Sequence, residues 1–105
     1  MKLDRKYILD LAKEILMIPS PSGYSKKIVP RILEEANKYE LASEQTKKGN
    51  LIITYPGKTD YKVGLSVHVD TLGAMVRSIN SAGEIKFTTR GGPIWPTLDG
   101  EYCTI

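Results

Sequence analysis

The chain has few of the residues that mark secreted or membrane-bound proteins. It contains one cysteine, Cys103, among 105 residues, which excludes an intramolecular disulfide and is typical of a reducing cytoplasm. No apolar run approaches the roughly 18–20 residues that a membrane helix requires. Residues 1–6 lead into an amphipathic pattern, whereas a secretory signal would have a continuous apolar stretch. We therefore expect a cytoplasmic protein with no membrane partner.

The chain also has little excess charge of either sign. Its 15 Lys and Arg residues face 12 Asp and Glu residues, so the formal net charge is +3. The basic residues occur singly or as the doublets Lys26-Lys27 and Lys47-Lys48, with acidic residues near them in the sequence. Proteins that bind single-stranded nucleic acid combine a basic groove with aromatic platforms, and this chain has no such alternation. We therefore expect no nucleic acid partner.

Two common catalytic motifs are missing as well. Gly91 and Gly92 lack the spacing of a phosphate-binding loop and precede no expected helix. Ser20 and Ser22 lie in a turn-forming stretch and not in the Gly-x-Ser-x-Gly sequence of serine hydrolases. Nucleotide-dependent chemistry and serine hydrolysis therefore have no support in the sequence.

What is present favours a folded chain that stops within a structural element. A hydrophobic content of 41% with 26% charged residues is ordinary for a globular protein, and 105 residues allow one domain at most. Residues 98–105 have a strand-forming composition and end without a cap or a polar tail. Because small domains usually end at a completed element, we expect this chain to be part of a larger structure.

Residues 3–36 predict two amphipathic helices. Apolar residues spaced by three, four and one indicate the first helix, which Asp4 can cap and Pro19 ends. The second helix has Ser25 as its candidate N-cap, and Pro30 predicts either a bend or a later start. The apolar positions are Leu3, Tyr7, Ile8, Leu11, Ala12, Ile15 and Leu16 in the first helix and Ile28, Val29, Ile32, Leu33 and Ala36 in the second.

The rest of the chain predicts strands. The first two strand-like runs flank the turn residues Gly49-Asn50 and indicate an antiparallel hairpin. The third run is apolar or small nearly throughout, which is typical of a strand buried on both faces of a sheet. The short runs that follow, separated by turns, predict an all-β unit that begins around residue 72. The runs occupy residues 41–46, 51–55, 62–69, 74–79, 84–88 and 100–105.

The single histidine, His68, lies at the end of the third run, and Asp70 follows two residues later. Residues i and i+2 of a strand point to the same face, so the carboxylate can hydrogen-bond one imidazole nitrogen and leave the other for a metal. Ligands of open α/β sheets also gather at the carboxyl ends of strands. A structural histidine is the alternative, because one histidine falls short of the three or four ligands that zinc requires. Both interpretations stay open on this motif alone.

Three motifs taken together are more specific. They are residues 18–24 (IPSPSGY) between the two helices, residues 48–51 (KGNL) in the hairpin, and residues 65–76 (LSVHVDTLGAMV). In this order they resemble the N-terminal part of the dinuclear-metal aminopeptidases of the tetrahedral and glutamyl aminopeptidase type, some of which are labelled endoglucanases. The resemblance covers the whole chain but only the first part of the family's architecture.

The resemblance implies an α/β fold in two parts. Residues 1–71 would form the N-terminal part of an α/β/α zinc-peptidase-like catalytic domain. Residues 72–105 would begin an inserted β-barrel-like domain, which mediates dimer contacts in that family and so implies a homo-oligomer.

The resemblance also implies a role for each residue of the His-x-Asp motif. His68 would ligate one of two divalent metal ions, zinc or cobalt, and Asp70 would orient its ring. The complete enzyme would remove N-terminal residues from short peptides. The family's other metal ligands and its general-base glutamate lie after the inserted domain, so the 105-residue chain alone is not expected to bind the metals stably or to be active.

Two other interpretations remain. Thr71 stands where the family more often has Glu, and a threonine here resembles the desuccinylase and carboxypeptidase group, whose members are also His-x-Asp enzymes with two metals. The turn at residues 21–24 and the strand at residues 73–76 favour the aminopeptidases. A different class of function is a non-catalytic domain that binds a partner chain through open strand edges.

Overall fold

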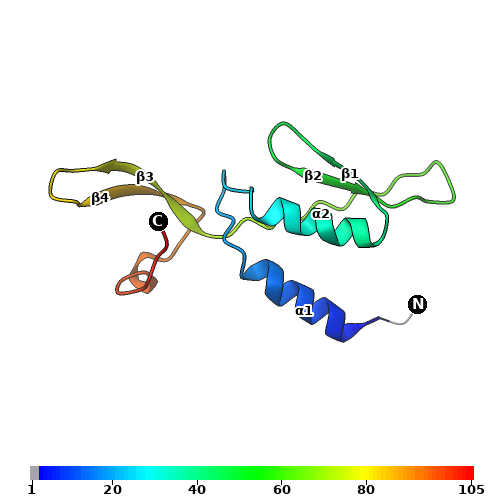
Figure 1. The fold of residues 1–105 in the computed structure, drawn as a ribbon, viewed down its shortest axis with the longest axis horizontal. Helices are drawn as coiled ribbons and strands as arrows, with labels where there is room; N and C mark the ends of the chain where they lie inside the picture. The colour runs from blue at the N-terminus through cyan, green and yellow to red at the C-terminus, as the bar shows by residue number, and fades with distance from the viewer. Residues whose placement is uncertain (1–2) are drawn as a thin grey trace.

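The structure, a computed structural model, describes residues 3–105 and contains two helices, two β-hairpins and one short 3-10 turn. The helices and the first hairpin lie at one end of the molecule, and the second hairpin and the 3-10 turn lie at the other end (Figure 1). This mixture of helices and strands agrees with the predicted α/β class. The elements are α1 (Arg5–Leu16), α2 (Ile28–Lys38), β1 (Ala42–Gln45), β2 (Leu51–Thr54), β3 (Gly73–Ile79), β4 (Ile85–Arg90) and η1 (Trp95–Thr97).

Helix α1 begins where the sequence predicts. Asp4 is its N-cap, and the Oδ1 atom of Asp4 accepts a hydrogen bond from the Tyr7 N–H at 3.0 Å. The helix ends at Leu16, before Pro19, whose ring disfavours helical geometry in the preceding residue. Helices α1 and α2 have 12 and 11 residues, and within residues 3–105 no helix is long and apolar enough to cross a membrane.

Helix α2 takes the later start that Pro30 allows. It begins at Ile28, so Pro30 is the third helical residue. The N–H groups of the first turn have no acceptor within a helix, so the missing N–H of Pro30 costs no hydrogen bond there. The predicted side-chain cap by Ser25 is wrong, because Lys27 is the N-cap and makes no side-chain cap bond. Ser25 acts through its backbone carbonyl, which accepts from the Val29 N–H at 3.0 Å.

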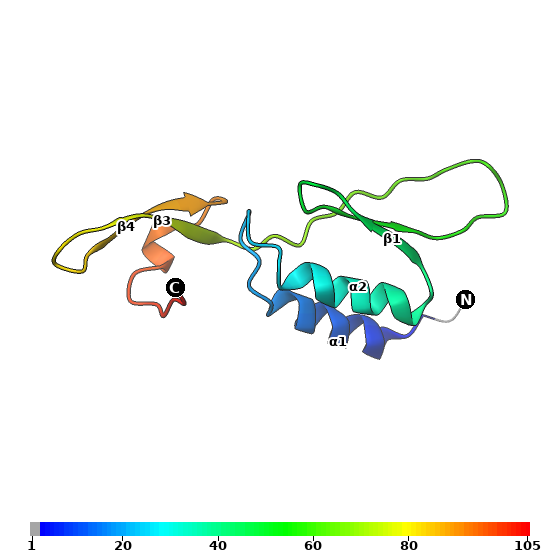
Figure 2. The same ribbon diagram turned by 45° about the horizontal axis from the view of Figure 1, so that its top comes forward.

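A charged cluster joins α1 to α2 where the two helices run side by side (Figure 2). Glu35 is 8% exposed, and its Oε1 atom accepts from the Tyr7 hydroxyl at 2.7 Å. The Oε2 atom of Glu35 accepts from Arg31 at 2.8 Å and from Lys38 at 2.9 Å. Arg31 also donates to Glu14 of α1, through Nη2 at 2.8 Å. The hydrogen bonds that Lys38, Tyr7 and Arg31 donate to Glu35, with that of Lys38 the largest cause, lower the pKa of Glu35 to about 2.

The predicted hairpin is present, and the strand-like runs at residues 74–79 and 84–88 form a second one. Strands β1 and β2 are antiparallel and close through a turn in which the Thr46 N–H donates to the Asn50 carbonyl at 2.8 Å. Gly49 has a φ of +87° in this turn, a conformation that glycine adopts without steric cost. Strands β3 and β4 are also antiparallel, with an irregular register between Val76 and Ser78.

Two predicted strands are absent from the part of the chain that the structure describes. Residues 62–69 are extended but unpaired, and Leu65 and Val67 are 92% and 86% exposed instead of buried on two faces. Residues 100–105 form no strand either. A strand requires a neighbour to hydrogen-bond with, and the ladders within residues 3–105 are the two isolated hairpins. The β-barrel-like domain is likewise not confirmed.

The described chain is elongated and has a small core. Its radius of gyration is 18.0 Å, compared with about 13 Å for a compact domain of this length. The buried apolar side chains within residues 3–105 are those of Ile28, Val29 and Ala36. Most of the stripe on α1 and the whole of residues 62–67 therefore remain in contact with solvent.

The extended segment touches the helical end of the molecule at one turn. The Thr71 N–H donates to the Ser20 carbonyl at 3.1 Å, and Pro21 and Thr71 form an isolated parallel bridge. A Cβ atom added to Gly73 would lie 2.5 Å from the Cβ atom of Pro21, so only glycine fits against this proline. The contact fixes where residues 69–73 pass the turn at residues 19–24.

Replacing Glu35 by glutamine should flatten the pH dependence of unfolding. Because the fold lowers the pKa of Glu35 from 4.5 to about 2, its ionised form stabilises the helix pair at neutral pH. This stabilisation is lost progressively as the pH falls below about 5, and it is gone only below the folded-state pKa of about 2, where the carboxylate is protonated in both states. We expect the urea midpoint of the wild-type chain, followed by circular dichroism, to fall over this range and that of Glu35→Gln to start lower and change less.

Glu34→Gln is the matched control for this experiment. Glu34 is the neighbouring carboxyl on the same helix and is exposed, so its replacement should keep the wild-type pH dependence. Identical pH profiles for the wild-type chain and Glu35→Gln would contradict the stabilising role of the cluster.

Replacing Gly73 by alanine should separate the turn from the extended segment. The new Cβ atom would overlap Pro21, so one of the two backbones must move. The hydrogen bond from the Thr71 N–H to Ser20 then weakens, and we expect the Thr71 amide to exchange with solvent about fivefold faster. Gly64→Ala is the control, since a Cβ atom there meets nothing within 4 Å. Equal exchange rates in the two variants would argue against the contact.

Candidate functional site

His68 and Asp70 lie in contact next to the turn. The Nδ1 atom of His68 is 2.8 Å from the Oδ1 atom of Asp70. The second carboxylate oxygen, Oδ2, accepts a hydrogen bond from the Ser22 hydroxyl at 2.9 Å. The structure therefore brings together the two residues that the sequence singles out and adds a third, Ser22, from the turn between the helices.

Ser20 holds the backbone on both sides of Asp70. It is 3% exposed, and its hydroxyl donates to the Val69 carbonyl at 2.6 Å. Its N–H donates to the hydroxyl of Thr71 at 3.1 Å, and its carbonyl accepts from the Thr71 N–H at the same distance. Thr71, which stands where the family motif more often has Glu, thus supports the turn with its side chain.

The hydrogen bond of the pair fixes the tautomer of the neutral form of the histidine. The hydrogen bond from Ser22, and after it the contact with His68, lowers the pKa of Asp70, so the carboxylate is ionised at neutral pH. An ionised carboxylate only accepts hydrogen bonds, so the proton of the neutral ring lies on Nδ1 and Nε2 keeps its lone pair. The side chains of His68 and Asp70 are 84% and 50% exposed, so Nε2 is open to a ligand.

The donor set fits one ligand of a metal site. A neutral imidazole whose second nitrogen is held by a carboxylate is the common form of a zinc-binding histidine. Zinc needs three or four ligands, however, and no group of three or more His, Cys, Asp and Glu side chains assembles anywhere in residues 3–105. Cys103 is exposed, contrary to its usual preference for the interior. Within the described region, His68 is thus a single candidate ligand.

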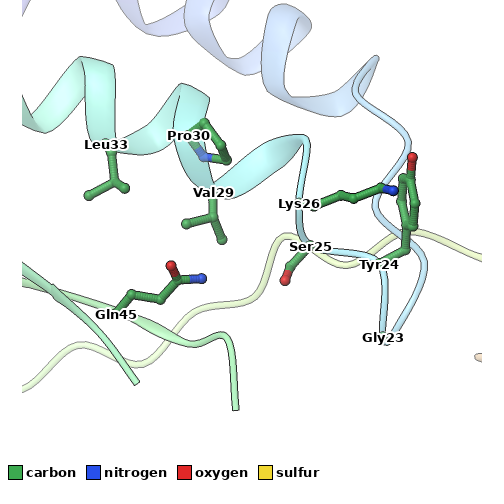
Figure 3. A pocket seen from close by; sticks show the side chains of 8 residues that line it. All are labelled: Gly23, Tyr24, Ser25, Lys26, Val29, Pro30, Leu33 and Gln45. Atoms are coloured by element: carbon green, nitrogen blue, oxygen red, sulfur yellow. The ribbon is translucent and has the colours of Figure 1, made fainter. Parts of the chain in front are cut away.

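A groove of about 550 Å³ opens beside the same turn, between α2 and β1 (Figure 3). Val29 and Leu33 give it an apolar side, and the Lys26 ammonium lies 4.9 Å from the centre of the Tyr24 ring. None of the residues that line it belongs to the group Ser22, Asp70 and His68. The groove is lined by Gly23, Tyr24, Ser25, Lys26, Val29, Pro30, Leu33 and Gln45.

Sequence reasoning missed the two serines of the turn. Ser20 and Ser22 fit a turn by composition alone, and the partners of their side chains lie 49 and 48 residues further along the chain. No periodicity or local motif connects positions so far apart. The one signal available was the coincidence of a Ser-Pro-Ser turn with a His-x-Asp motif in the same short chain.

Comparisons with known proteins identify a family and two relatives. The family model described as M42 glutamyl aminopeptidase matches residues 49–105, which include His68 and Asp70. A Bacillus subtilis (strain 168) protein with the name "Putative aminopeptidase YhfE" is 38% identical over 98 residues, which make up 92% of this chain and 28% of that protein. An Acetivibrio thermocellus protein with the name "Putative aminopeptidase" is 30% identical over 90 residues, which make up 86% of this chain and 27% of that protein.

The chain thus spans little more than a quarter of the length of these two relatives. The family model, in contrast, covers more than half of the chain, from the turn of the first hairpin onward. On this match the chain belongs to the M42 glutamyl aminopeptidase family.

Proposed function

We propose that this chain supplies part of the metal site of an aminopeptidase that removes N-terminal residues from short peptides. The observation that carries the proposal is the hydrogen-bonded group of Ser22, Asp70 and His68, which leaves Nε2 of the imidazole open. Family membership supports a peptidase. The names of the two relatives support the aminopeptidase class.

Each residue of the pair has one task in this proposal. His68 would hold one of two divalent metal ions, zinc or cobalt, through Nε2. Asp70 keeps the proton on Nδ1 and fixes the plane of the ring, which orients Nε2. Bound metal ions would polarise the scissile carbonyl and activate water. With one candidate ligand within residues 3–105, the chain alone should bind these ions weakly and be inactive.

We also propose a division at about residue 72. Residues 1–71 would belong to the catalytic domain and residues 72–105 to an inserted β domain that contacts a second copy. In support, the two hairpins lie at opposite ends of the molecule and are joined by an extended segment (Figure 1). The second hairpin and the 3-10 turn after it also expose apolar side chains, among them Phe87 and Trp95, whose ring centres are 6.0 Å apart. The single, exposed cysteine is consistent with the cytoplasm as the proposed location.

A second candidate function is the binding of a partner chain through open strand edges. The observation that favours it is the exposed and unpaired course of residues 62–67. Light scattering after size-exclusion chromatography tests it, because a monomeric chain would argue against it. The desuccinylase and carboxypeptidase group is a further alternative, which a substrate screen of the complete gene product would separate.

The complete gene product that contains this chain should hydrolyse aminoacyl-p-nitroanilides. We expect a chelator to abolish the activity and added Zn²⁺ or Co²⁺ to restore it, because the metal ions activate the water. The isolated 105-residue chain should show no chelator-sensitive hydrolysis. A purified 105-residue chain with such activity would overturn the assignment of a single ligand. An inactive complete gene product with bound metal would overturn the proposed aminopeptidase activity.

Replacing Asp70 by alanine in the complete gene product should lower the activity by about 10–100-fold, the usual effect of losing a carboxylate that orients a metal-bound histidine. Excess metal should restore part of the activity if the loss lies in metal affinity. Asp60→Ala is the matched control, since Asp60 is an exposed aspartate that precedes His68 in the chain. Equal activities of the two variants would contradict the orienting role of Asp70.

A further inference from the structure

We propose that Ser22 is a positioning residue, which holds the carboxylate of Asp70 and through it the imidazole of His68 in the orientation that a metal ligand requires. The proposal rests on the proposed function for the metal itself. The positioning of the ring, in contrast, can be measured on the chain without metal.

The carboxylate of Asp70 has one partner on each oxygen. Oδ1 contacts the His68 ring at 2.8 Å, and Oδ2 accepts from the Ser22 hydroxyl at 2.9 Å. Asp70 is half exposed, so with a single partner its carboxylate would be free to rotate in solvent. A second hydrogen bond on the other oxygen fixes the plane of the carboxylate, and the plane determines where the Nδ1–H of the ring must point.

The backbone places Ser22 for this contact independently of its side chain. Ser20 is anchored to Val69 and Thr71, and Pro21 packs against Gly73. These contacts hold the turn against residues 69–73, and from this position the Ser22 hydroxyl reaches the carboxylate of Asp70. The turn is therefore fixed by its neighbours, and the hydroxyl of Ser22 is left to act on the carboxylate.

The turn itself does not need the hydroxyl of Ser22. It is closed by the Tyr24 N–H, which donates to the Pro21 carbonyl at 2.8 Å, and Gly23 adopts the required φ of +93°. Within residues 3–105, the hydrogen bond of the Ser22 hydroxyl is the one to Asp70, 48 residues further along. Replacing Ser22 by alanine should therefore leave the turn intact while releasing one oxygen of Asp70.

The test reads the tautomer of His68 directly. His68 is the single histidine of the chain, so ¹⁵N-detected NMR of imidazole nitrogens reports on this side chain alone. At about pH 9, where imidazoles are neutral, we expect the Nδ1–H tautomer to predominate in the wild-type chain. Ser22→Ala should lower the ratio of the Nδ1–H to the Nε2–H tautomer by about threefold, the effect of weakening one hydrogen bond.

Three further variants separate positioning from a merely structural role. Ser22→Thr keeps a hydroxyl and should restore the wild-type ratio. Asp70→Ala should lower the ratio further, and adding Ser22→Ala to it should change nothing more, because the serine acts through the carboxylate. Ser66→Ala removes an exposed hydroxyl from the same extended segment and should leave the ratio unchanged.

The outcomes decide the proposal without reference to enzyme activity. A ratio that is unchanged by Ser22→Ala, or changed equally by Ser66→Ala, would overturn it. So would a wild-type ratio that is insensitive to Asp70→Ala. If the tautomer responds as expected but the complete gene product shows no chelator-sensitive activity, the proposed function fails while the positioning by Ser22 stands.

Discussion

The crossing of the turn at residues 19–24 with residues 69–71 is the contact on which the candidate site depends. Its polar groups lie about 50 positions apart in the chain, so closing this loop opposes a considerable chain entropy. Several hydrogen bonds around the buried Ser20 offset that entropy together, and each would be weak alone. Asp70, which contacts His68, meets Ser22 because this crossing holds the two backbone segments together.

The crossing in turn relies on a helix pair that is held more by charge than by a core. Three buried apolar side chains, all on α2, give little hydrophobic stabilisation for a described region of this length. Glu35 instead receives hydrogen bonds from both helices, and Arg31 bridges it to Glu14. Such a cluster defines the relative position of α1 and α2, and the connector between them is the turn that carries Ser20 and Ser22.

Local signals in the sequence predicted the elements that local interactions form. Asp4 caps α1, and Gly49 closes the first hairpin, because both act on residues within one turn of the chain. The prediction of a buried strand at residues 62–69 was wrong, since a strand depends on neighbouring strands that no local pattern supplies. His68 and Asp70 were found because they are two residues apart, whereas Ser22 was missed because its partner lies 48 residues away.

The backbone at His68 is held in place only by the residues that follow it in the chain. After it, Val69 and Thr71 are bonded to Ser20, whereas before it residues 62–67 form no ladder within the described region and expose their apolar side chains. A ligand held from one side loses further freedom when a metal binds, and this loss weakens binding. Covering residues 62–67 with neighbouring strands would fix the backbone of His68 from its other side. In the proposed site, burial of this apolar segment and metal affinity would therefore be linked through the same residues.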